Sequence, residues 1–223
     1  MTSSTDHLIS GLVEDLEPVR PLPRLRLAFA VILALWATLL GLVLWAHVGN
    51  AGLFHLFDRP TLEIRVYLVS FLGLLIASLG GTASALAAGI PGRERIEIGG
   101  MSLALVGLVA AAVTCLVGID ALAHPVRAAP AGTDAMCFRQ GVVFSLLPAG
   151  VILSFLVRGW TLHPIRAAMI ALVASGALGA LIVHANCGFF GPRHLLIGHL
   201  SIPIVFALLG VYPLAILLRR IRN

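Results

Sequence analysis

Long apolar segments are the feature that most restricts what this chain can fold into. Six of them approach the length of about 20 residues that a helix needs to cross the hydrocarbon core of a bilayer. They are residues 25–45, 66–88, 98–117, 141–157, 165–183 and 195–218, of which the fourth is the shortest. These segments use more than half of the 223 residues and leave no room for a separate soluble domain. The sequence therefore predicts an all-α polytopic membrane protein, with a bundle of six transmembrane helices over residues 25–223.

Composition supports a location in a membrane. The chain is 59% hydrophobic and only 11% charged, with a mean hydropathy of +1.03. A soluble domain could not cover so much apolar surface. An outer-membrane barrel would show strands that alternate in polarity, whereas the run LAFAVILALW at 27–36 is apolar throughout.

Basic residues are scattered along the chain. The formal charge of +5 comes from 15 basic residues, all arginine, that flank the apolar segments. Arginines in such places anchor helices at a membrane face, and no basic run is interleaved with aromatics as on a nucleic-acid surface. We therefore predict the lipid bilayer as a partner and no direct contact with nucleic acid.

The same arginines predict the orientation. Six spans place both termini on one side, together with ten arginines: Arg20, Arg24, Arg26, Arg93, Arg95, Arg158, Arg166, Arg219, Arg220 and Arg222. The other side carries five: Arg59, Arg65, Arg127, Arg139 and Arg193. Because positive loops favour the cytoplasm, we expect both termini to be cytoplasmic.

Residues 1–24 form a separate head with the pattern of a short amphipathic helix. Its apolar face consists of Leu8, Ile9, Leu12, Val13 and Leu16, and its acidic residues, Asp6, Glu14, Asp15 and Glu17, lie largely off that face. A helix this short is marginal alone in water, so its apolar face needs a partner. The membrane surface is one candidate, but the absence of Lys and Arg before Arg20 favours a protein groove with a basic rim.

Cysteine and histidine residues gather near the predicted outer face. Cys137 falls in the loop between spans three and four, and Cys187 follows span five. His184 stands three residues before Cys187, so on a continuing helix their Cβ atoms would be about 5–6 Å apart. Thiolates and imidazoles bind soft and transition metals. The candidate ligands of such an ion are Cys137, Cys187, His184, His194 and His199.

Other interpretations of these residues stay open. The two cysteines could form a static disulfide around a loop of about 50 residues, worth about 3–4 kcal/mol. They could be a redox or metal sensor, or two unrelated buried thiols, since the spacing has no zinc-finger pattern. His184 and His194 could be interfacial residues with solvated tips, and His199 a hydrogen-bond partner between helices. Cys115, inside an apolar run, is predicted to be a small buried hydrophobic residue.

Catalytic patterns are missing from the sequence. It contains no nucleophile–base pair, phosphate-binding glycine loop or paired carboxylates, so we do not expect an enzyme. A small metal-ion or solute transporter is disfavoured because the predicted spans hold almost no ionisable residue other than His199. A membrane thiol oxidoreductase commonly needs a C-x-x-C motif, which is also lacking.

The head and the cysteine positions together resemble a known family. Residues 6–20 read D-x-L-I-x-x-L-x-x-D-L-x-P-V-R; six spans follow, with one cysteine between the third and fourth and another after the fifth. This pattern resembles the negative-regulator-of-sigma-F family of bacterial inner-membrane anti-sigma factors, over about residues 6–222. In that family a histidine often directly precedes the second cysteine, whereas here two residues separate His184 from Cys187.

The resemblance implies a partner and a direction of signalling. Such proteins hold an extracytoplasmic-function sigma factor at the membrane and release it when a metal or redox stress arrives outside. The implied sigma-binding residues are Leu8, Ile9, Leu12, Asp15, Leu16, Pro18, Val19 and Arg20. The implied sensing pair is Cys137 and Cys187, and His184 is the candidate helper.

Overall fold

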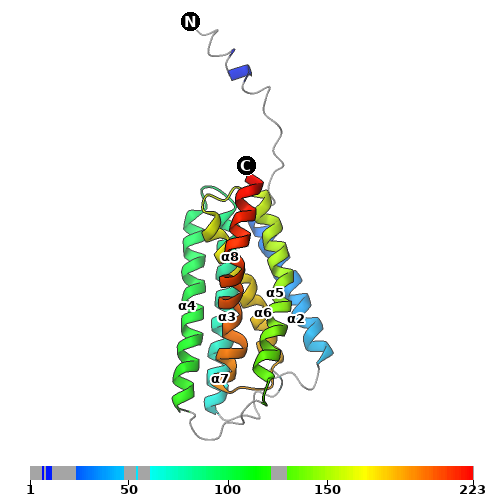
Figure 1. Cartoon of the computed structure of the whole chain (residues 1–223), viewed down its shortest axis with the longest axis vertical. Helices are drawn as coiled ribbons and strands as arrows, with labels where there is room; N and C mark the ends of the chain where they lie inside the picture. Colours follow the sequence, from blue (N-terminus) through cyan, green and yellow to red (C-terminus); the bar gives the residue numbers. More distant parts are fainter. Residues whose placement is uncertain are drawn as a thin grey trace.

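Six long helices lie side by side in the computed structural model (Figure 1). The structure describes residues 7, 9–11, 24–47, 54, 61–121 and 130–222. Its elements there are α2 (Leu25–Ala46), α3 (Thr61–Ala88), α4 (Glu94–Ala121), α5 (Thr133–Arg158), α6 (Pro164–Asn186), α7 (Pro192–His194), the π-helical turn η2 (Leu195–Leu200) and α8 (Ser201–Arg222). Each of α2 to α6 is long and apolar enough to cross a membrane, and α7, η2 and α8 together make the sixth such helix. The predicted all-α architecture with six spans is confirmed.

The fourth span differs most from the prediction. Helix α5 begins at Thr133 instead of residue 141, directly after Gly132, whose φ of 86° ends the preceding turn. The first two turns of α5 include the polar residues Thr133, Asp134, Arg139 and Gln140, and a hydropathy pattern detects only the part of a helix that is apolar throughout. The expectation that Cys137 lies in a loop is therefore wrong, because Cys137 lies in the second turn of α5.

Helix α6 is the central element of the bundle. Almost all its residues are buried, because α3, α5 and α8 pack around it. Small residues let these helices approach closely. A Cβ atom added at Gly176 would lie 2.5 Å from the Cα atom of Pro203 in α8, and one added at Gly81 in α3 would lie 3.0 Å from the Cβ atom of Ala174. The position of α6 is thereby fixed from three sides.

Helices α3 and α4 form an equally close pair. A Cβ atom on Gly80 would lie 2.7 Å from the carbonyl oxygen of Gly100, and one on Gly100 would lie 2.5 Å from that of Gly80. Contact of this kind requires glycine on both helices.

Helix α2 lies at the edge of the bundle. Ile32 is its only buried residue, and one side chain ties it to the centre: Trp36 donates a hydrogen bond from Nε1 to the carbonyl oxygen of Leu178 in α6, at 3.0 Å. The helix that follows the head is thus attached to the bundle by few contacts, one of which reaches the central helix.

Two polar contacts join the turns at the end of the bundle where α2 begins and α8 finishes (Figure 1). Arg166 of α6 donates from Nε to Oε1 of Glu97 in α4 at 2.6 Å. The backbone N–H of Trp160 donates to the carbonyl oxygen of Gly89 at 3.0 Å. The α3–α4 and α5–α6 turns are therefore held together.

Candidate metal centre

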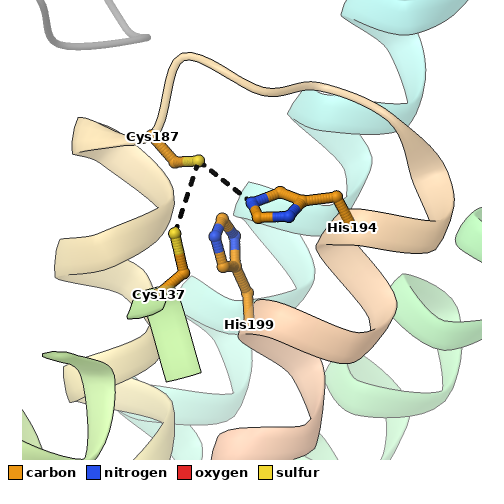
Figure 2. Close-up of side chains that lie close together, drawn as sticks. All are labelled: Cys137, Cys187, His194 and His199. Atoms are coloured by element: carbon orange, nitrogen blue, oxygen red, sulfur yellow. Dashed lines mark hydrogen bonds between the residues drawn. The ribbon is translucent and has the colours of Figure 1, made fainter. Parts of the chain in front are cut away.

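Four sulfur- and nitrogen-bearing side chains converge at the other end of the bundle. Cys137 comes from α5, Cys187 directly follows α6, His194 ends α7 and His199 lies in η2 (Figure 2). One sulfur or ring nitrogen atom of each lies within 4.8 Å of those of the other three. The two Sγ atoms are 3.9 Å apart, and Cys187 Sγ is 3.1 Å from His194 Nε2. Side chains from three different spans therefore point at one small volume.

The cluster is closed to its surroundings. The exposed fractions are 7% for Cys137, 8% for Cys187, 4% for His194 and 0% for His199. Buried polar atoms need partners, so their convergence requires a chemical explanation.

The π-helical turn η2 brings the two histidines together. In an α-helix, side chains five residues apart point about 140° away from each other, which would separate His194 from His199. In a π-helix, hydrogen bonds from i to i+5 stack such residues, and the N–H of Ser201 makes this bond to the carbonyl oxygen of Leu196. The two imidazole rings are consequently 5.0 Å apart between centroids.

His194 is oriented by an acidic residue. Its Nδ1 lies 2.5 Å from Oδ1 of Asp134 in the first turn of α5. A carboxylate only accepts hydrogen bonds, so Nδ1–H donates to it, and in the neutral imidazole Nε2 then keeps its lone pair. That lone pair faces the Cys187 sulfur. Sequence reasoning missed Asp134, although its position three residues before Cys137 would have placed both on one helix face once α5 was known to start at Thr133.

A second chain of hydrogen bonds orients His199. The Nε2–H of His184 donates to the carbonyl oxygen of Tyr67 at 3.2 Å, so the Nδ1 of neutral His184 is an acceptor. The Nδ1–H of His199 then donates to it at 3.1 Å. This leaves a lone pair on His199 Nε2, a buried atom that has no hydrogen-bond partner in the structure.

His184 does not contact the cysteines in the way the sequence indicated. Helix α6 ends at Asn186 and the backbone of Cys187 is extended, so the two residues do not share a helix face. Tyr67 holds His184 in place instead: its hydroxyl donates to the His184 carbonyl oxygen at 2.8 Å, and the rings lie 4.4 Å apart. His184 is thus an orienting residue behind His199, and the predicted His184–Cys187 pair is corrected to His194–Cys187.

The cysteines form no disulfide, and the three of them occupy two environments. Contact with the Cys137 sulfur, together with burial, raises the pKa of the Cys187 thiol, because a second negative charge beside the first would be unfavourable. Cys115 lies elsewhere, buried between α4 and α3 with its sulfur 3.2 Å from Ser70 Oγ, as its apolar neighbourhood predicted.

Most of the predicted sigma-binding head falls outside the described residues. These positions are Leu8, Leu12, Asp15, Leu16, Pro18, Val19 and Arg20. Ile9 is described, and its side chain is exposed.

Fold and cluster together define a multi-pass helical membrane protein with a buried cysteine–histidine site at one end of its bundle. A comparison with protein families goes further, since residues 12–219 match the family described as negative regulator of sigma F. The match covers most of the chain, so the protein belongs to the negative-regulator-of-sigma-F family. It is accordingly a negative regulator whose partner is a sigma factor. No curated protein and no solved structure matches the chain.

Proposed function

We propose that this chain is a bacterial inner-membrane anti-sigma factor that senses metal or redox stress through its cysteine–histidine cluster. Its head, residues 1–24, would sequester an extracytoplasmic-function sigma factor in the cytoplasm. The observation that carries this proposal is the separation of the two ends: α2 begins where α8 finishes, and α7 lies at the opposite end (Figure 1). An input site and an output segment on opposite sides of a membrane are what a transmembrane regulator requires.

The arginine distribution supports the direction of signalling. The end rich in arginine is expected in the cytoplasm, so we expect the cluster at the periplasmic face. The periplasm is oxidising, and incoming metal ions and oxidants reach it before they reach cytoplasmic reductants. A thiol pair at this face is suited to report on both.

Helix α6 offers a physical connection between the cluster and the head. Cys187 follows its last residue, and the carbonyl oxygen of Leu178 holds Trp36 of α2. A change in the bonding of Cys187 acts on the end of a helix that is packed on three sides. A hundredfold shift between two arrangements needs about 2.7 kcal/mol of differential binding. Bonds to a thiolate can supply this, whereas one neutral hydrogen bond contributes only about 1 kcal/mol.

The geometry of the cluster favours regulation over catalysis. Its four side chains are buried, and their sulfur and ring nitrogen atoms face one another within 4.8 Å. An enzyme site needs room for a reacting molecule beside its functional groups.

Co-purification from native membranes tests the proposal. The full-length chain should retain its sigma factor, and deletion of residues 1–24 should release it. Leu12→Asp or Leu16→Asp should also abolish retention, because each places an unpaired charge in an apolar groove, at a cost of several kcal/mol.

Ser10→Asp is the matched control, because it adds the same charge off the apolar face and should preserve binding. A sigma factor that stays membrane-bound and silent after the head is deleted would place the binding site elsewhere.

A further inference from the structure

The cluster has the donor set of a closed metal site. His199 Nε2 is fully buried without a hydrogen-bond partner, an arrangement that is unfavourable unless something binds its lone pair. His194 Nε2 also directs a lone pair toward the same point, because the ring proton of the neutral imidazole lies on Nδ1, which donates to Asp134. Both imidazoles are therefore in the form that binds a cation, and both lie beside two sulfur atoms.

We propose that these four side chains bind one tetrahedral divalent metal ion of the zinc class. The ligand atoms are Sγ of Cys137, Sγ of Cys187, Nε2 of His194 and Nε2 of His199. The inference specifies the ligand of the site that the proposed function uses for sensing. It is nevertheless tested on the purified chain without a sigma factor, so either proposal can fail alone.

The sulfur separation agrees with this ion class. Two thiolates bound at about 2.3 Å in a tetrahedral arrangement lie about 3.8 Å apart, and the sulfur atoms here are 3.9 Å apart. Two sulfur and two nitrogen donors exclude magnesium and calcium, which take oxygen ligands. Four protein ligands complete the tetrahedron and leave no open position for a substrate.

Charge balance supports the same assignment. Coordinated cysteines are thiolates, and two thiolates offset the double positive charge of the ion. The loaded site is then neutral, as burial at this depth requires. A disulfide between Cys137 and Cys187 would instead leave both Nε2 atoms without a partner.

Asp134 and His184 are positioning residues in this site. Each accepts the Nδ1–H of one ligand histidine and so fixes the ring and its tautomer. Removing such a partner lowers metal affinity by about 10–100-fold without removing a ligand.

Metal binding to the full chain, purified in phospholipid nanodiscs under reducing conditions, tests the proposal. We expect one Zn²⁺ per chain by elemental analysis. Co²⁺ should give the intense visible absorption of a tetrahedral ion and a sulfur-to-metal band in the near ultraviolet. Cys137→Ser, Cys187→Ser, His194→Ala and His199→Ala should each lose the tetrahedral spectrum. Asp134→Asn and His184→Phe should keep it, with an affinity about 10–100-fold lower.

Two controls separate ligand loss from misfolding. Cys115→Ala removes a buried thiol outside the cluster, and His163→Ala removes a histidine at the other end of the bundle; both should bind Co²⁺ like the unchanged chain. The proposal is overturned if His199→Ala and His194→Ala retain the tetrahedral spectrum at unchanged affinity. It is overturned equally if an added thiol oxidant, with the reductant removed, converts Cys137 and Cys187 to the disulfide as readily with excess Zn²⁺ as without it.

Discussion

Each histidine of the cluster makes its Nδ1 hydrogen bond to a different kind of group. His194 donates to a carboxylate, whereas His199 donates to the neutral imidazole of His184, which itself reaches only a backbone carbonyl. A carboxylate partner makes an imidazole a stronger base. The two nitrogen donors are therefore unequal, and we expect the site to depend more on Asp134 than on His184.

Replacing either cysteine of the pair should be enough to abolish the regulated response of sigma-dependent genes. Cys137→Ser or Cys187→Ser should leave a sigma-dependent reporter indifferent to added soft metal ions and oxidants, because the remaining hydrogen bonds cannot bias two states of the bundle. Reporter activity in exposed cells measures this. Cys115→Ala should respond normally. A Cys137/Cys187 double variant that still responds would remove the cluster from the signalling path.

Sequence reasoning singled out the residues that lie together in this cluster, but not the contacts between them. Cys137, Cys187, His194 and His199 were recognisable because thiols and imidazoles are rare in apolar chains and these lie at segment ends. Their assembly was not, because it depends on where helices start and stop. One residue past the end of α6, the extended backbone of Cys187 cancels the helical spacing from His184.

At the scale of elements, η2 is the feature on which the site depends most directly. Deleting Leu200, the last residue of η2, should convert the π-helical turn to α-helix, since π-turns contain one residue more than the surrounding helix, while His194 and His199 stay five residues apart. His194 and His199 would then diverge, and tetrahedral Co²⁺ absorption should disappear while membrane insertion persists. Ile197→Ala keeps the turn and should keep the absorption. Retention of the spectrum after the deletion would contradict this role of η2.

A second prediction at this scale concerns the hydrogen bond that attaches α2 to α6. Trp36→Phe keeps an aromatic ring but removes the hydrogen bond to Leu178, worth about 0.6–2 kcal/mol between membrane helices. We expect the stimulus-dependent change of the reporter to shrink, while the chain still inserts and binds metal. Trp45→Phe, on an exposed side chain of the same helix, is the matched control. Equal responses from the two variants would show that this hydrogen bond carries no signal.

The presence of each helix was predictable from the length of its apolar segment, but its first and last residues were not. All six spans appear in the structure, yet the turns of α5 before residue 141 and the extension of α6 to Asn186 lie beyond the apolar segments. The π-helical turn has no compositional signal, because its sequence, LLIGHL, is as apolar as ordinary membrane helix. Packing against α5 and α6, not local preference, distinguishes it.

At the scale of the whole molecule, the prediction concerns which side of the membrane each end of the bundle faces. A reporter fused after Asn223 should be active only in the cytoplasm. Cys137 is too buried for reliable labelling, so the exposed neighbour Met136 is the better probe, as Met136→Cys in a Cys115→Ala background. An impermeant thiol reagent should reach it from outside, and should reach Leu162→Cys, exposed at the opposite end, only after membranes are opened. The reverse labelling pattern would invert the proposed direction of signalling.

Burial of the cluster should also affect the delay between exposure to a stimulus and the response of the protein. None of the four side chains is more than 8% exposed, and the segment between α6 and the last span lies over them (Figure 2), so we expect an ion or an oxidant to reach them only when this segment moves. The frequency of that local opening, and not the equilibrium affinity, then sets the delay before a response begins. If the cluster is the sensor, as we propose, we therefore expect the output to respond to a sustained exposure and not to a brief one.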